Sequence, residues 1–396
     1  MLQAIQLTSG RRAMGLLVRP AGVICGAVIL CALGARGAET LYSVTNLGIL
    51  PGADSSKAAS INDRGQVTGQ SGGRVFLWDA KTGLQDLGSD GFASITAVAI
   101  NNIGQIAGNA MVYDPPNYPL RGLRWTAGQW EILGFLGNFY RNTMVSAIDD
   151  MGRIAGASDA PTAMHAFRSA PTGAELVDLG SLNGNDDDSG AGGINASGQV
   201  VGSSNVAGRQ RHAFLWTEGG TDGPPSNPQM RDLGTLGGTQ SQANGTSDSG
   251  IVVGGSSTAG DAAYHAFVWE RGEMTDLGTL GHISSRAFAV NNEGQVIGSI
   301  WGADGNAHAI IWDRKYGMRQ LNELLHPVSG RGWSIAVVSD INNAGQIVGE
   351  GEYQGQSRAI LLTPIPEPAW EWMMVPMGVV ACRALRARWG NVSSKQ

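Results

Sequence analysis

The chain has 396 residues, 59 of them glycine, and a formal net charge of −6. Four basic residues lie in residues 1–37 and four more in residues 369–396, beside a single acid. The stretch between them therefore keeps 19 basic and 32 acidic residues, a net charge of −13. A body this acidic repels a phosphate backbone, which argues against a nucleic-acid partner.

The first 37 residues are typical of an export signal. Arg11, Arg12 and Arg19 precede an uncharged apolar run at 21–35, and small residues follow it, with a suitable cleavage site after Gly37. An uncleaved N-terminal anchor is the alternative.

Cysteine is confined to the two ends of the chain. The three cysteines are Cys25, Cys31 and Cys382. The body between them therefore has no candidate for thiol catalysis or for a cysteine–metal site.

A nine-residue motif occurs seven times, at spacings of 39–52 residues. The copies are INDRGQVTG (61–69), INNIGQIAG (100–108), IDDMGRIAG (148–156), INASGQVVG (194–202), TSDSGIVVG (246–254), VNNEGQVIG (290–298) and INNAGQIVG (341–349). In the first copy, Asn62 suits the start of a turn and Gly65 suits a backbone with positive φ. Each motif therefore predicts a β-hairpin with a short loop, and its Asn and Gly are interpreted as turn formers.

Two further strands are expected in each unit. A continuous apolar run such as AFLW (213–216) is typical of a strand covered on both faces. A run that ends in DLG, as at 232–234, follows it. Four strands repeated with this period indicate a β-propeller, with an open solenoid as the alternative.

The two ends of the repeat distinguish these architectures. The last motif is followed by AILL (359–362) but by no DLG strand, whereas YSVTNLG (42–48) is such a strand without a unit of its own. We therefore expect an all-β propeller over residues 38–364, with seven four-stranded blades closed when the N-terminal strand completes the last blade. Six or eight blades are the alternatives. An open solenoid would need capping repeats, and none is visible.

The closing strand also fixes the orientation of the blades. If it is outermost, the strand that enters each motif lines the central channel. The DLG-to-motif connections then share one face with the connections before the apolar strands, and the motif turns share the other.

The repeat resembles the HAF family of extracellular repeats over about 42–362. His-Ala-Phe occurs at 165–167, 212–214 and 265–267, and the wider pattern is clear in 212–216, 230–238 and 290–298. This resemblance implies an exported bacterial β-repeat protein of no established activity, and it transfers no catalytic residue.

Residues 365–396 resemble a PEP-CTERM sorting tail. PEP at 366–368 is followed by a largely apolar stretch at 369–382 and a basic cluster at 383–388. The resemblance implies processing by an exosortase-like membrane enzyme, transient membrane association, and delivery to the cell surface or matrix. The apolar stretch is short and is interrupted by Glu371 and Pro376, so a weak anchor or a disordered tail is the alternative.

Two long loops, 111–121 and 134–144, belong to consecutive units and should be neighbours. Exposed aromatic rings beside arginine suit the binding of a sugar or peptide. The candidate ligand-binding residues are Tyr113, Tyr118, Phe139, Tyr140 and Arg141, joined by Arg331 and Trp333 from 321–333. Local packing that pins the long loops is the alternative.

Two sets of residues raise the question of a metal. His165, His212, His265 and His308 occupy equivalent places in different units, too far apart to share one zinc, so we interpret them as polar contacts at strand starts. Asn183, Asn185 and Asp187 alternate as calcium ligands do, but the loop ending in Glu is absent, which favours an acidic solvated loop. No cofactor is expected.

The sequence therefore predicts an exported binding or structural module at a bacterial surface or in its matrix. An extracellular polysaccharide or a surface protein would be its partner. The alternative is a polysaccharide-active lyase or glycosidase, which needs a unique pair of converging carboxylates. Asp residues that recur in turns and DLG triplets are poor candidates for such a pair. A structural spacer without a ligand is the third hypothesis.

Overall fold

A computed structural model describes residues 40–366, apart from residues 93, 113–118, 138–140, 185–186 and 209. Residues 40–366 form one compact unit. The predicted export signal, and the sorting tail beyond residue 366, lie outside the described residues.

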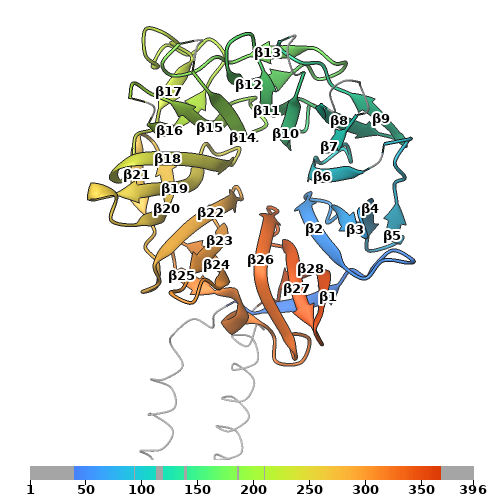
Figure 1. Cartoon of the computed structure of the whole chain (residues 1–396). Coiled ribbons are helices and arrows are strands. Elements are labelled where there is room, and N and C mark those ends of the chain that lie inside the picture. Colours follow the sequence, from blue (N-terminus) through green and yellow to red (C-terminus); the bar gives the residue numbers. More distant parts are fainter. Residues whose placement is uncertain are drawn as a thin grey trace, which may run out of the picture. The chain divides into compact units, whose positions relative to one another are not determined.

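The described chain forms seven four-stranded antiparallel blades (Figure 1). The first three are β2 (Ser56–Ile61), β3 (Val67–Ser71), β4 (Arg74–Asp79) and β5 (Gly83–Asp86); β6 (Ile95–Ile100), β7 (Ile106–Met111), β8 (Leu120–Thr126) and β9 (Gln129–Ile132); and β10 (Thr143–Ile148), β11 (Ile154–Asp159), β12 (Met164–Ser169) and β13 (Leu176–Asp178). Blade 4 comprises β14 (Ser189–Ile194), β15 (Val200–Asn205), β16 (Arg211–Trp216) and β17 (Met230–Asp232).

The remaining blades follow in chain order around the ring. They are β18 (Gly237–Thr246), β19 (Val252–Thr258), β20 (Tyr264–Glu270) and β21 (Glu273–Asp276); β22 (Ser284–Val290), β23 (Val296–Trp301), β24 (Ala307–Asp313) and β25 (Gly317–Gln320); and β26 (Trp333–Ile341), β27 (Ile347–Tyr353) and β28 (Gln356–Pro364). Two short 3-10 helices, Ala259–Asp261 and Leu321–Leu324, lie in connections.

The seventh blade is completed by β1 (Tyr42–Asn46), which pairs antiparallel with β28. This confirms the predicted seven-bladed β-propeller and its closure by the N-terminal strand. The ends of the unit meet there, since the Ile365 N–H donates to the Leu41 carbonyl at 2.8 Å. A ring closed in this way leaves no blade without its fourth strand.

The motif turns have the local structure that the sequence predicts. Gly65 has a φ of 75° and donates its N–H to the Asn62 carbonyl at 3.0 Å. The Asn62 side-chain oxygen accepts from the N–H groups of Arg64 and Gln66, which holds the loop in shape. The same Asn-to-Gly backbone bond closes the turns at Gly104, Gly198, Gly294 and Gly345.

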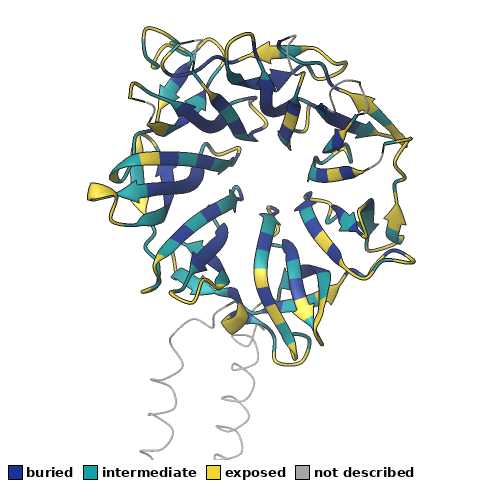
Figure 2. Ribbon diagram, in the orientation of Figure 1, coloured by how far each residue is buried: buried dark blue, intermediate teal, exposed yellow. Residues whose placement is uncertain are grey.

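The hydrophobic core lies between adjacent blades. One cluster joins Ala58, Val67 and Phe76 of blade 1 to Val348 and Leu361 of blade 7. The phenylalanines of the third strands, Phe76, Phe167, Phe214 and Phe267, are fully buried. Figure 2 shows buried residues along the strands of every blade and exposed ones mainly in the connections. Each blade is therefore stabilised by burial against both neighbours.

The innermost strand of every blade is the one that enters the motif, as predicted. We call the face formed by the seven motif turns the turn face, and the opposite face, formed by connections such as 87–94, the loop face. The described chain begins and ends at the turn face, because Tyr42 pairs with Pro364 and Thr363 approaches Gln346 of the last turn.

Candidate functional site

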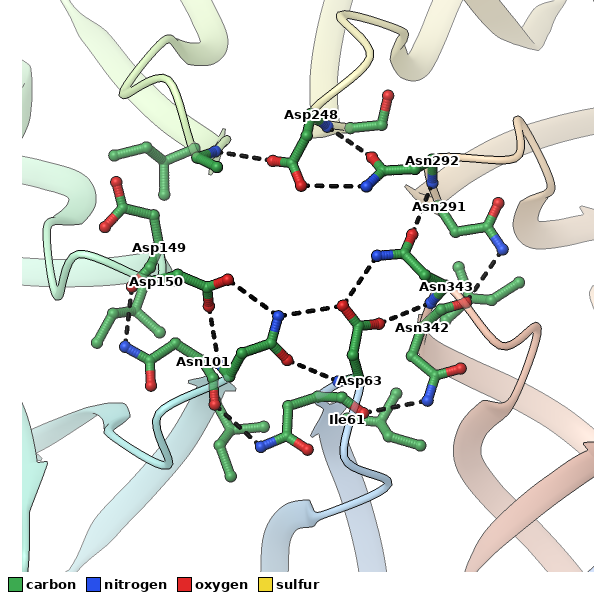
Figure 3. A pocket seen from close by; sticks show the side chains of 18 of the residues that line it. Ile61, Asp63, Asn101, Asp149, Asp150, Asp248, Asn291, Asn292, Asn342 and Asn343 are labelled. Carbon is green, nitrogen blue, oxygen red and sulfur yellow. Dashed lines mark hydrogen bonds between the residues drawn. The ribbon is translucent and has the colours of Figure 1, made fainter.

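The turn face carries a ring of hydrogen bonds around the propeller axis, which we call the collar (Figure 3). Its members are the third residues of the seven motifs: Asp63, Asn102, Asp150, Ala196, Asp248, Asn292 and Asn343. The backbone N–H of one member donates to the side chain of the next blade's member, as from Asp63 to Asn102 at 2.7 Å and from Asn343 to Asp63 at 2.8 Å. Six of the seven junctions are made in this way.

The missing junction lies between blades 3 and 4. Ala196 has no side-chain acceptor for the Asp150 N–H. Arg153 compensates in part, because its guanidinium donates to the Ala196 carbonyl at 2.9 Å and also pairs with Asp149. The collar therefore links neighbouring blades by hydrogen bonds around the ring, except between blades 3 and 4.

A second row of bonds lies beneath the collar, made by the second residues of the motifs. Five buried asparagines donate their amide groups to the backbone carbonyl of the next blade: Asn62, Asn101, Asn195, Asn291 and Asn342. These side chains thus hold their own turn and the neighbouring blade together. The sequence predicted the first role and not the second, because the partner carbonyl lies in the next blade, 39–52 residues away along the chain, or 280 residues away where Asn342 meets Asn62.

The axis encloses two adjoining cavities that share Ile100, Ile148, Ile194 and Val290 in their walls. The outer cavity, of about 190 Å³, opens at the collar. The inner cavity, of about 210 Å³, is lined by the innermost strands further along the channel. The outer cavity is lined by residues of the seven motifs, and the inner cavity adds the two residues before each motif, which differ from blade to blade.

The inner cavity contains one carboxylate, that of Asp340. The residue before the motif is small in every other copy: Ser60, Ala99, Ala147, Gly193, Gly245 and Ala289. Phe288 and Asn244 also line this cavity, as do the hydroxyl-bearing residues Ser60, Ser146 and Ser339. The exceptions to the repeat therefore converge on one place.

Asp340 is held by three donors. The Ser60 hydroxyl and the Ile61 N–H donate to its Oδ2 at 2.6 and 3.1 Å, and the Ile341 N–H donates to its Oδ1 at 2.8 Å. Although the channel leaves part of the side chain open, the surrounding blades enclose it, and this desolvation raises the pKa of Asp340 above its ordinary value. The hydrogen bonds oppose that rise, and the charge of Asp63 adds to it.

Besides Asp149, which pairs with Arg153, four carboxylates line the axis: Asp63, Asp150, Asp248 and Asp340. Within the described part of the chain, no lysine or arginine forms an ion pair with any of them. The axis is therefore a negatively charged passage inside an acidic molecule.

Three repeat histidines make the strand-start contacts that we predicted. His165, His212 and His265 each place Nδ1 at 2.8–3.1 Å from the carboxylate of the DLG aspartate in the same blade. Burial alone would raise the pKa of Asp232, but the bonds from His212 and from the Gly234 N–H lower it overall. His308 lies in blade 6, where Gln320 replaces the aspartate; its ring is 5.3 Å from that of His282.

Only part of the predicted ligand-binding site on the long loops lies within the described residues. Tyr113, Tyr118, Phe139 and Tyr140 are outside the described residues. Of their neighbours, Arg121 and Arg141 both lie over the Phe135 ring, at 4.9 and 5.6 Å, and the Leu120 N–H donates to Asn142. The flanks of the two long loops thus meet, as expected of neighbouring connections.

The other two candidates lie elsewhere on the ring. Trp333 begins β26 in blade 7 and stacks on Tyr353 at 5.0 Å, and Arg331 is exposed beside it. Blades 1 and 2 separate them from Arg141. The described candidates therefore form two groups, each packed on aromatic residues of its own surroundings.

The calcium candidate is a hydrogen-bonded loop where it is described. The Asn183 amide donates to Asp187 at 2.6 Å, and Asn185 is outside the described residues. Among the residues with described positions, no group of three His, Cys, Asp or Glu is arranged to hold a metal ion. None of the helices in that same part is long and apolar enough to cross a membrane.

Comparison with known proteins gives fold likenesses of low identity. No protein-family model matches the chain, and no curated protein matches it either. The β-propeller domain of the Trilobed protease from Pyrococcus furiosus is 8% identical, with a TM-score of 0.48 over 78% of this chain and 95% of that one. TolB from Acinetobacter baumannii is 14% identical, with a TM-score of 0.44 over 86% and 83%.

The acylaminoacyl peptidase from Pyrococcus horikoshii is 10% identical, with a TM-score of 0.44, and the match covers 77% of this chain and 52% of that one. Structural similarity at these identities and TM-scores gives no information about what this chain binds.

Proposed function

We propose that this propeller is an exported binding module of a bacterial surface or extracellular matrix, and that it recognises an extracellular polysaccharide or a surface protein. The observation that carries this proposal is the convergence of non-repeated residues on the inner cavity. A structural spacer without a ligand would need only the residues that recur in every repeat. Asp340 and Phe288 instead stand at channel positions where the other copies have small or unrelated residues.

The proposal of export and delivery to the surface rests on the two terminal segments of the sequence. The N-terminal segment resembles an export signal, and the C-terminal one resembles a tail that an exosortase-like enzyme would process. The absence of cysteine between residues 38 and 381 fits a domain that relies on its core, since every blade buries its strands against two others. The resemblance to HAF repeats supports the same location.

The enzymatic alternative needs a second carboxylate opposite the first. Asp340 is the one carboxylate in the described lining of the inner cavity, and Asp63 is engaged by Asn102 and Asn343 in the collar. These observations favour binding over hydrolysis or elimination.

A glycan array tests the proposal. We would apply the full chain, in mild detergent because of its apolar ends, beside Asp340→Asn and Tyr140→Ala variants. Binding that is lost in Asp340→Asn would assign recognition to the channel, and binding lost only in Tyr140→Ala would assign it to the long loops. If the parent binds no glycan and captures no surface protein from the same bacterium, the binding function is wrong.

A further inference from the structure

The inner cavity combines groups that suit a cation with hydroxyl groups. Asp340 contributes a carboxylate from blade 7, and Phe288 contributes an aromatic side chain from the adjacent blade 6. The Phe288 ring is held edge-on by Trp301, with centroids 6.5 Å apart. An ammonium group is attracted both to a carboxylate and to the face of an aromatic ring.

Asp340 keeps capacity for a further donor. An ionised carboxylate offers about four acceptor positions. Three donors occupy them here, two on Oδ2 and one on Oδ1. The remaining position on Oδ1 belongs to a side chain that lines the cavity, and no basic residue of the described chain forms an ion pair with it.

Polar groups with unused capacity lie around the same space. The amide nitrogen of Asn244 donates to the Ala287 carbonyl at 2.7 Å, and no donor within the described residues reaches its side-chain oxygen. Ser146, whose side chain carries a hydroxyl, also lines the cavity. A volume of about 210 Å³ accommodates one sugar ring but not a folded peptide segment.

We propose that the inner cavity binds the primary ammonium group of a small hydroxylated amine, such as an amino sugar, with Asp340 as its counter-charge and Phe288 beside it. The inference rests on the proposed binding function and names the chemistry of its ligand. The negative charge of the collar favours entry of a cation and disfavours an anion. A free amino sugar and the end of an amino-sugar polymer share this chemistry.

Calorimetric titration of the full chain with D-glucosamine tests the proposal. D-glucose and N-acetyl-D-glucosamine serve as controls, since they keep the ring and lose the ammonium group. We expect glucosamine to bind at least about tenfold more tightly than either control, because a charged donor strengthens the bond to a carboxylate. A glucosamine oligomer with a similar affinity per chain would identify a polymer end as the source, and binding of the monomer alone would identify a free amine.

Two variants locate the site. Asp340→Asn should weaken glucosamine binding at least about tenfold, since it removes the charge. Phe288→Lys leaves the three hydrogen bonds to Asp340 intact and places an ammonium group in the cavity. It should therefore abolish binding, and it tests the site even if Asp340→Asn folds poorly. Asp222→Asn removes an exposed carboxylate that pairs with Arg231 and lines neither cavity; it is the matched control and should change the affinity less than about threefold.

Equal affinity for glucose and glucosamine would overturn the inference, as would unchanged binding by Phe288→Lys. If glucosamine does not bind while the array detects a neutral glycan, the inference fails and the proposed function stands. If glucosamine binds and the array is blank, the ligand chemistry stands and a polysaccharide partner does not.

Discussion

In six of the seven motifs, the last glycine leaves no room for a β-carbon, because the backbone of the innermost strand lies too close. It lies opposite a β-bulge in the innermost strand, as where Gly254 pairs with Ala243. A β-carbon at Gly254 would be 1.9 Å from the Gln242 carbonyl oxygen, and similar clashes recur at Gly69, Gly156, Gly202, Gly298 and Gly349. The bulge and the glycine therefore depend on each other.

We expect Gly254→Ala to destabilise the propeller by about 2–3 kcal/mol, because the clash is with backbone that cannot move aside without opening the bulge. The measurement is the free energy of unfolding in urea. Gly108→Ala is the matched control, since its nearest atom would be 3.0 Å away, and it should cost clearly less. Gly108 also lies opposite a bulge, so equal costs for the two variants would show that the close approach of the Gln242 carbonyl does not set the constraint.

Asp340 should give the propeller a pH dependence of its own. Its pKa is raised in the folded state, so the folded chain holds the proton more tightly than the unfolded chain does. As pH falls from above the raised pKa towards the ordinary value, the wild type should gain stability relative to Asp340→Asn, by up to about 1.4 kcal/mol per pH unit. Urea midpoints of both proteins across that range measure the difference.

Asp232 serves as a control, because its pKa is shifted in the direction opposite to that of Asp340. Its pKa is lowered by His212 and the Gly234 N–H, so its contribution is present above the ordinary pKa of aspartate and is lost as pH falls through the lowered value. The advantage of the wild type over Asp232→Asn should therefore shrink in acid. If Asp340→Asn behaves in the same way, the enclosure of Asp340 in the channel wall is not what governs its titration.

At the scale of elements, the turns act as the joints between blades. Six of the seven collar members accept a bond from the preceding blade, and Ala196 is the member that does not. We expect Ala196→Asn to supply an acceptor for the Asp150 N–H and to stabilise the propeller by about 1 kcal/mol. Thermal unfolding measures this effect. Ser197→Asn, one residue further along the turn, should leave the melting temperature unchanged; a similar gain there would contradict a specific collar bond.

The strands and turns were largely predictable because the same sequence pattern occurs in seven copies. The hairpin at Asn62 and Gly65, the four strands per unit and the closing strand at 42–48 all follow from local turn chemistry and from counting. The links of Asn62 to the Asn101 carbonyl and of Ser60 to Asp340 were not predictable, since they join different blades. The site differs from the fold in this respect: Asp340 is an exception to the repeat, and only the ring brings it together with Phe288.

At the scale of the whole molecule, one short strand determines whether the ring is closed. β1 supplies the fourth strand of blade 7, and its Tyr42 is 1% exposed, with burial raising the pKa of that phenol to about 12. The His326 N–H also donates to the Tyr42 carbonyl at 2.8 Å, which ties the connection between blades 6 and 7 to the same strand. β1 therefore links blade 7 to the connection that comes from blade 6 and, through residues 47–55, to blade 1.

Deleting residues 40–46 should lower the free energy of unfolding by at least about 4 kcal/mol, through loss of a buried tyrosine and of a ladder of backbone bonds. It should also expose the edge of β28 to other chains. A synthetic peptide of residues 40–50 should restore the melting temperature by adding the missing strand. The same peptide with Tyr42→Ala should restore less, because the main-chain bonds remain and the buried ring does not. If both peptides rescue equally, the main-chain bonds and not the buried Tyr42 ring supply the stabilisation. If the deletion melts like the wild type, closure by β1 is not what holds the seventh blade, and the hydrogen bonds of the collar must hold the ring together.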